Sequence, residues 1–343
     1  MSAGINMIMG GLDLNNKMLF MAEPMLNTSS VYASVLSIIS DDLKKIQPWI
    51  MTHFIQLRYV EDWDVLFFDN HHVLFATCPW IESHGLSREF MSVKWRTFKD
   101  FIIDAISHDY YIWCHVDRYY LPPSSAYHNR HHDHELLIFG YDVDQNKVHF
   151  ADYLSDGKFA KFTHTECGLD EMEEAFWSMN SDNPHLTSIN LLRKREYRYS
   201  INLDYVIESI QRYLFSKPTY TMHLYKTIDV YGLDIYYKII TKNERIGNHP
   251  EFEMDVRIYH LLWEHKKLMK DRILYFMENG LVHQSSLADA CDELVNNVLI
   301  IRNMSMKYNV SKDIKLLQRI NSKIASLALQ ETEMLKTLLS NLV

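Results

Sequence analysis

The stretch from Asp117 to Asp152 constrains the fold more than any other part of the chain. Runs rich in Phe, Tyr, Val and Ile lie on both sides of a short polar turn signal, Val-Asp-Gln-Asn at residues 143–146. This pattern predicts two antiparallel strands joined as a hairpin. His134 lies in the first strand and Asp152 in the second. A carboxylate can fix one ring nitrogen of a histidine so that the other acts as a base, so the hairpin carries the back half of a possible catalytic triad.

The register of this hairpin decides whether the two side chains meet. With a four-residue turn, Asp142 pairs with Lys147 and Leu137 pairs with Asp152, which places His134 and Asp152 on opposite faces. A loop of three or five residues, or one β-bulge, would return them to the same face. The sequence leaves both arrangements open.

The remaining pattern divides the chain into two parts. Short apolar runs predict further strands at 64–69, 72–78, 110–116 and 188–199. Helical spacing predicts helices from Ser29 or Ser30 to about 41–45, and at 89–106, 169–179 and 203–215. Beyond residue 220 the pattern changes to long helices, at 231–242, 253–278, 285–308 and 313–342. We therefore predict an α+β protein of 343 residues, with an antiparallel-sheet domain over 1–217 and a mainly helical domain over 218–343.

The composition narrows the class of protein. A formal net charge of −9 argues against a nucleic-acid-binding surface, because phosphate contacts need clustered Lys and Arg. No segment approaches the roughly 20 apolar residues of a membrane span, and the first residues lack a secretion signal. We therefore expect a cytoplasmic protein that binds neither nucleic acid nor membrane. The four cysteines have no CxxC spacing and are expected to be reduced and buried.

Several motifs occur in order along most of the chain. They are Asn27 before the first predicted helix, Asp117-Arg-Tyr-Tyr-Leu-Pro, His134 with Gly140-Tyr-Asp, Asp152, Val230-Tyr-Gly-Leu-Asp-Ile-Tyr and Asp255-Val-Arg-Ile-Tyr-His-Leu-Leu-Trp-Glu-His-Lys. Their order resembles the butirosin-biosynthesis-H-like family, whose N-terminal domain is related to papain-like and bacteriocin-processing cysteine peptidases. The resemblance implies a papain-like domain followed by a helical domain that covers its cleft. It also implies acyl transfer from a carrier-protein thioester to an amine by Cys, His and Asp.

The resemblance assigns His134 as general base and Asp152 as the carboxylate that orients it. The family's nucleophilic cysteine follows an Asn just before the first helix, whereas here Asn27 is followed by Thr28 and Ser29. A helix N-terminus lowers the pKa of a thiol and offers N–H groups to an oxyanion, but a hydroxyl gains much less. Three hypotheses stay open. Thr28 or Ser29 acts as a hydroxyl nucleophile, His134 activates the attacking amine directly, or the protein is a pseudoenzyme that binds a partner without catalysis.

Polar residues before the hairpin are further candidates for substrate binding. With Asn27, they are Asp117, Tyr119, Tyr127 and His128. The histidines at 128, 131, 132 and 134, with Glu135, also invite a metal hypothesis, but the run lacks the His-Glu-x-x-His spacing that places two ligands on one helical face. We predict no metal and no other cofactor; the phosphopantetheine arm of a carrier protein is part of the substrate.

Glu264 and His265 lie on the predicted helix 253–278, and His265 falls on its apolar stripe. A polar residue that faces a core usually has a partner, so a structural hydrogen-bond network is one interpretation. Recognition of an amine substrate is the other, if the helical domain closes over the cleft.

The sequence thus supports three hypotheses on function. The first is an acyltransferase-type enzyme of specialised-metabolite biosynthesis that forms an amide, or cleaves a thioester, on an acyl or peptidyl carrier protein, with a small amine or peptide as second substrate. The second is a degenerate family member that binds a pathway partner without catalysis, motivated by the missing cysteine. A peptidase is the third. The long apolar stripes of the helical region are also consistent with a homodimer.

Overall fold

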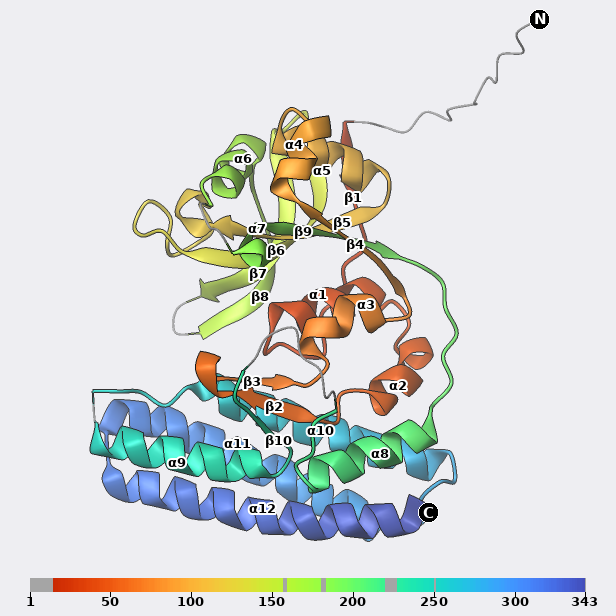
Figure 1. Ribbon diagram of the computed structural model, residues 1–343, viewed down its shortest axis with the longest axis vertical. Coiled ribbons are helices and arrows are strands. Elements are labelled where there is room, and N and C mark those ends of the chain that lie inside the picture. Colours follow the sequence, from red (N-terminus) through yellow and green to blue (C-terminus); the bar gives the residue numbers. More distant parts are fainter. Residues whose placement is uncertain (1–14, 157–158, 180–182, 220–226, 250, 343) are drawn as a thin grey trace, which may run out of the picture. The chain divides into compact units, whose positions relative to one another are not determined.

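The computed structural model describes residues 15–156, 159–179, 183–219, 227–249 and 251–342 (Figure 1). It is a mixed α/β structure with an antiparallel sheet and several helices. The chain forms two compact units: the first comprises the residues up to Asp41 and Leu74–Tyr197, and the second comprises Asp42–Val73 and the residues from Arg198 onward. No helix in the described ranges is both long and apolar enough to cross a membrane.

This division differs from the predicted boundary after residue 217. The second unit contains a three-stranded antiparallel sheet in the order β10-β2-β3, made by β2 (Leu57–Val60), β3 (Val65–Phe68) and β10 (Asp229–Tyr231). Pairing of Val230 with Tyr59 ties an early segment to a late one. A sequence pattern shows local periodicity but not such long-range pairing, so it placed the early segment in the first predicted domain.

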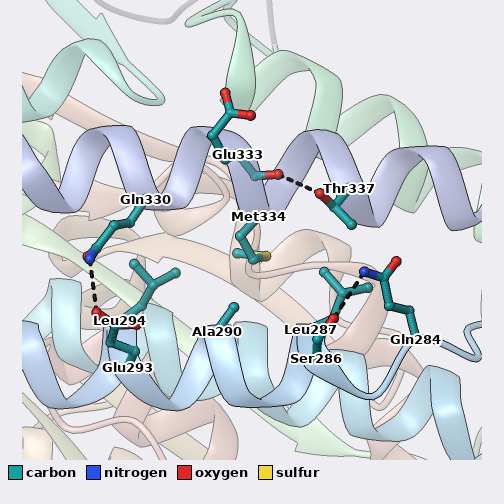
Figure 2. Close-up of a pocket in the computed structure, with 10 residues that line it drawn as sticks. All are labelled: Gln284, Ser286, Leu287, Ala290, Glu293, Leu294, Gln330, Glu333, Met334 and Thr337. Carbon is teal, nitrogen blue, oxygen red and sulfur yellow. Dashed lines mark hydrogen bonds between the residues drawn. The ribbon is translucent and has the colours of Figure 1, made fainter.

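The helices of the second unit lie largely where the periodicity predicts them, except the first, which was not predicted. They are α2 (Leu43–Thr52), α8 (Leu203–Leu214), α9 (Asp234–Asn248), α10 (Val256–Glu278), α11 (Ser286–Ser311) and α12 (Ile314–Leu342). Between α11 and α12 lies a pocket of about 260 Å³ with an apolar floor of Leu287, Leu294 and Met334 (Figure 2). Polar side chains that line this pocket form hydrogen bonds with one another; Gln330, for example, donates to Glu293 at 2.9 Å. None of the predicted site residues lines the pocket.

Gly232, which precedes α9, is required by its conformation and by its surroundings. Its φ is +54°, and a Cβ there would lie 2.1 Å from the carbonyl oxygen of Tyr213. We expect Gly232→Ala to destabilise the protein by more than about 2 kcal/mol, because a left-handed backbone penalty adds to a backbone clash. Gly280→Ala is the matched control: its φ is +69° but nothing lies within 4 Å of its Cβ, so only the conformational penalty applies. Equal shifts of the two thermal unfolding midpoints would contradict this expectation.

The first unit is built on an antiparallel sheet in the order β4-β9-β5-β6-β7-β8, with β1 added to β6. The strands are β1 (Asn16–Met18), β4 (Ile81–Ser87), β5 (Tyr110–Asp117), β6 (Asp133–Asp142), β7 (Lys147–Asp156), β8 (Phe159–Gly168) and β9 (Ser188–Lys194). The predicted hairpin is confirmed as β6 and β7, and the predicted strands 110–116 and 188–199 correspond to β5 and β9. The strands β1 and β4 were not predicted.

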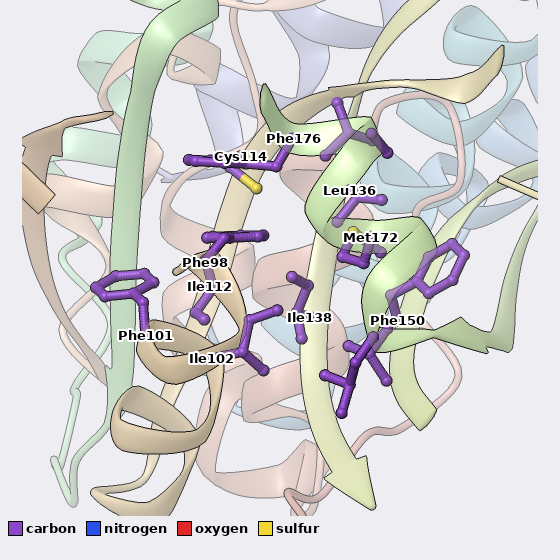
Figure 3. Close-up of a cluster of buried hydrophobic side chains, with 14 of the residues drawn as sticks. Phe98, Phe101, Ile102, Ile112, Cys114, Leu136, Ile138, Phe150, Met172 and Phe176 are labelled. Atoms are coloured by element: carbon purple, nitrogen blue, oxygen red, sulfur yellow. The ribbon is translucent and has the colours of Figure 1, made fainter. Parts of the chain in front are cut away.

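Helices cover both faces of this sheet. They are α1 (Ser30–Ile39), α3 (Leu74–Thr77), α4 (Arg88–Lys94), α5 (Phe98–Ser107), α6 (Leu169–Trp177) and α7 (Pro184–Thr187). On one face, α5 and α6 bury Phe98, Ile102 and Phe176 against Leu136 and Phe150 of the strands (Figure 3). On the other face, α1 packs against β6 and β7 (Figure 1).

Two predicted elements are wrong. Residues 72–78 form no strand: a 3₁₀ turn (His71–Val73) leads into the short helix α3, an ambiguity expected of a short apolar run. Residues 89–106 are two helices, because Trp95 is extended and the Thr97 side chain starts α5 by accepting the N–H of Asp100 at 3.0 Å. Helix α2, in the second unit, was not predicted either: the first helix was expected to end at about 41–45, whereas α1 ends at Ile39 and α2 follows.

Candidate active site

A β-bulge sets the register of the β6–β7 hairpin. Asp142 pairs with Lys147, as a four-residue turn requires, but the register shifts between Ile138 and Gly140. Leu137 therefore pairs with Ala151 and not with Asp152, which corrects the pairing expected from the turn alone. Because one extra residue on β6 exchanges the faces, His134 and Asp152 lie on the same face of the sheet.

The two side chains meet. His134 Nδ1 lies 3.1 Å from Asp152 Oδ1 and 2.9 Å from the carbonyl oxygen of Glu135. Both neighbours are acceptors, so Nδ1 carries a proton and donates it to them. Among the residues that the structure describes, Nε2 of His134 makes no hydrogen bond, and the side chain is 25% exposed. The ring is therefore fixed in the orientation that a general base needs, with Nε2 available.

Arg118 holds the carboxylate of the pair. Its Nε donates to Asp152 Oδ2 at 2.8 Å, its Nη2 bonds to Oδ1, and Nη2 also donates to the carbonyl of Tyr153 at 2.9 Å. Asp152 is 1% exposed and also accepts the N–H of Tyr153 at 2.6 Å. Sequence reasoning missed Arg118 as a site residue, although it lies in the Asp117-Arg-Tyr-Tyr motif.

The electrostatics of the pair favour an ionised Asp152 and a more basic His134. Burial alone would raise the pKa of Asp152, but hydrogen bonds from His134 and Arg118 hold that pKa below its usual value. Burial alone would lower the pKa of His134. The hydrogen bond to Asp152 and the negative charges of Glu135 and Asp152 outweigh it, so the pKa of His134 lies above its usual value.

The start of α1 is attached to the same two strands. Ser29 caps the helix by accepting the N–H of Val31 at 3.3 Å. The hydroxyl of Tyr153, on β7, donates to the carbonyl oxygen of Asn27 at 2.5 Å. Ser30, the first residue of α1, donates its hydroxyl proton to Glu135 Oε1 on β6. The predicted residues Asn27, Thr28 and Ser29 thus lie in a segment that is anchored at both ends to the hairpin that carries the His/Asp pair.

None of the cysteines replaces the missing nucleophile. Cys78, Cys114, Cys167 and Cys291 are buried and form no disulfide, as predicted. Burial raises the pKa of Cys114, which lies closest in sequence to the site, to about 12. Such a thiol is not ionised at neutral pH and does not act as a nucleophile.

Asp117 organises the loop that precedes β6. Its carboxylate accepts the N–H groups of Tyr119 and His132, each at 3.0 Å, and bonds to Nδ1 of His131 at 2.6 Å. Tyr119 stacks on His131 at 4.5 Å between ring centroids. Because Asp117 precedes Arg118 and fixes Tyr119, which follows it, Asp117 contributes to the position of the guanidinium that holds Asp152.

Tyr127 and His128 stack on each other in the same loop, with ring centroids 4.0 Å apart. His128 has a positive φ of 48°, which local contacts must stabilise.

Within the described ranges, no group of three or more His, Cys, Asp or Glu side chains is placed to hold a metal ion.

Glu264 and His265 belong to the second unit. His265 is fully buried; its Nε2 lies 2.8 Å from the carbonyl of Ile55, and its Nδ1 lies 2.9 Å from Lys266 Nζ. Glu264 is 4% exposed and lies 3.5 Å from Nε2 of His260. Since both ring nitrogens of His265 are occupied inside the unit, the geometry favours the structural interpretation of this residue.

The network around Lys266 extends further into the core of that unit. Lys266 pairs with Glu331 and donates to the hydroxyl of Tyr213 at 3.0 Å. Glu331 also accepts the hydroxyls of Tyr213, at 3.2 Å, and Tyr236, at 2.5 Å. Sequence reasoning suggested a buried hydrogen-bond network at His265 but not these partners, because they are separated by up to 118 residues.

Comparison with known proteins identifies no family for this chain: no protein-family model matches it, and no curated protein is significantly similar to it.

Proposed function

We propose that the protein is an acyltransferase of the papain-like type, which moves an acyl or peptidyl group from a carrier-protein thioester to an amine. The observation that carries the proposal is the buried Arg118–Asp152–His134 chain of contacts beside the start of α1. A carboxylate that orients a partly exposed histidine, next to a helix N-terminus, is the arrangement that acyl transfer by a papain-like site requires.

The chemistry forms a C–N bond and breaks a C–S bond. The amine attacks the thioester carbonyl directly, or attacks an ester formed with a hydroxyl of the protein; in either case it loses one proton and the leaving sulfur gains one. His134 Nε2 accepts the amine proton, and Asp152 stabilises the imidazolium that forms. Asp152 and Glu135 raise the pKa of His134, which makes His134 a stronger base for this proton transfer.

The proposal is tested with acyl-pantetheine thioesters of several chain types, each offered with a panel of primary amines. Mass spectrometry should detect the amide and the free thiol in equal amounts, at a rate proportional to the protein. The variant His149→Ala is the control: His149 lies on β7 but bonds towards Glu166 at 3.5 Å, so its removal should leave the rate unchanged. Thioester consumption that matches the uncatalysed rate across the panel would contradict the proposal.

The pH dependence of the reaction follows from the environment of His134. A general base works only when deprotonated, and the raised pKa of His134 keeps it protonated to a higher pH. We therefore expect kcat/KM to fall with decreasing pH, with a midpoint above 6.5, the ordinary value for histidine. Titration of kcat/KM between pH 5 and 9 checks this. A midpoint at or below the ordinary value would show that His134 is not the group that limits the rate.

The presence of Thr28 in place of the expected cysteine favours a second function, that of a binding protein. In that case the protein should bind a carrier protein saturably without consuming its acyl group. Calorimetric titration with an acyl-loaded carrier protein, followed by mass spectrometry of the same sample, separates binding from turnover.

A further inference from the structure

Ser30 presents its hydroxyl proton to a carboxylate. Its hydroxyl donates to Glu135 Oε1, and Glu135 Oε2 lies 3.7 Å from Nε2 of His115 and 3.8 Å from Nδ1 of His134. His115 stands directly opposite Glu135 in the pairing of β5 with β6. Glu135 thus lies between the hydroxyl at the start of α1 and the His134–Asp152 pair, and its side chain is 27% exposed.

Two ring nitrogens on the same side of β5 have no partner among the described residues. They are Nε1 of Trp113, whose residue is 9% exposed, and Nδ1 of His115. Alternate strand residues share a face, and these two rings lie 5.3 Å apart. Burial lowers the pKa of His115, which favours the neutral form of its ring. Buried polar atoms normally have partners, so these two nitrogens are unused hydrogen-bonding groups on the face of the sheet that carries Glu135.

We propose that Ser30 is the nucleophile of the acyl transfer and that Glu135 accepts its proton, so that the acyl group passes through a Ser30 ester. This inference rests on the proposed function. It assigns a nucleophile to replace the cysteine that is expected after Asn27 and is not there. A hydroxyl attacks a carbonyl only when a base removes its proton in the transition state, and hydrogen-bonding contact between nucleophile and base is the geometric requirement. Ser30 and Glu135 meet it.

The two half-reactions balance. In the first, Ser30 Oγ forms a C–O bond with the thioester carbon, the C–S bond breaks, and the serine proton passes through Glu135 to the leaving sulfur. In the second, the amine forms a C–N bond with the same carbon and the C–O bond breaks. The proton that the amine loses to His134 replaces the one on Ser30 Oγ. The products are the amide and the free thiol.

Trapping the ester tests the assignment. The protein is mixed with an acyl-pantetheine thioester without amine, quenched in acid and digested with trypsin. Cleavage after Lys17 and Lys44 places all three candidate hydroxyls in one peptide, in which fragmentation distinguishes Thr28, Ser29 and Ser30. We expect one acyl group, on Ser30, and a loss of acylation rate of at least about 100-fold in both Ser30→Ala and Glu135→Gln.

Two further variants keep the test decisive if Ser30→Ala folds poorly. Ser34→Ala is the matched control, because Ser34 lies one turn along α1, is fully buried and has no hydrogen-bond partner among the described residues; its acylation rate should be unchanged. Ser30→Cys keeps a nucleophile, and should be acylated and also alkylated by iodoacetamide, with acylated thiol protected from alkylation.

The outcomes separate the two proposals. Acylation of Thr28 or Ser29, or full turnover by folded Ser30→Ala with no trapped ester, would overturn the role of Ser30 and leave the acyltransferase function standing. Failure of the unmodified protein to consume any thioester would remove both.

Discussion

Replacing His134 by glutamine should lower kcat for thioester turnover by about 10³–10⁴-fold while the thermal unfolding midpoint stays close to that of the unmodified protein. Glutamine keeps a side-chain N–H that can reach Asp152, so the buried carboxylate retains a donor. It cannot accept the amine proton. Because the 25% exposed ring of His134 lies at the end of the buried Arg118–Asp152 pair, its loss affects chemistry more than folding. Steady-state rates and a thermal melt measure the two effects on the same sample.

Asp152→Asn supplies the comparison. This change removes the negative charge that faces the Arg118 guanidinium in a site that is 1% exposed at Asp152. Breaking a buried ion pair costs about 3–5 kcal/mol. Asp152→Asn should therefore lose both activity and stability, whereas His134→Gln loses mainly activity. If His134→Gln retains more than about a tenth of the rate, His134 is not the general base.

Replacing Glu331 by glutamine should destabilise the protein by about 3–5 kcal/mol, because it leaves the Lys266 ammonium buried without a counter-charge. Both side chains are almost inaccessible, at 1% and 0% exposure. Burial lowers the pKa of Lys266 although Glu331 opposes this effect, so burial disfavours the charged form of this lysine. Chemical denaturation followed by circular dichroism measures the change.

The double variant Lys266→Met/Glu331→Gln should cost less than the sum of the two single changes, with a coupling of about 1–3 kcal/mol. It removes both charges and keeps an amide oxygen for the hydroxyls of Tyr213 and Tyr236. Lys336→Met is the surface control, since Lys336 and Glu333 are 58% and 74% exposed and such a pair contributes about 0.5 kcal/mol or less. Additive single effects would mean that Lys266 and Glu331 do not act as a pair.

Local periodicity predicted the elements in which one face stays buried along most of the length. The long helices α10 to α12 and the hairpin β6–β7 were found because their apolar stripes are long or alternate regularly. The short strands β1, β2, β4 and β10 were missed, because three to seven residues carry little periodicity and their strand form depends on a distant partner. The same reason explains why 72–78, an isolated apolar run, was predicted as a strand and is a turn and short helix.

The sequence by itself determined which residues could carry chemistry: His134 and Asp152 on neighbouring strands, a hydroxyl-rich helix start after Asn27, and no usable cysteine. Only the tertiary structure decided that these residues meet. One bulge between Ile138 and Gly140 turns the pair to a common face, and Ser30 meets Glu135 across 105 residues of chain. Side-chain identity and local period are properties of a short segment. Register shifts and long-range contacts depend on the packing of the whole unit, which no short segment contains.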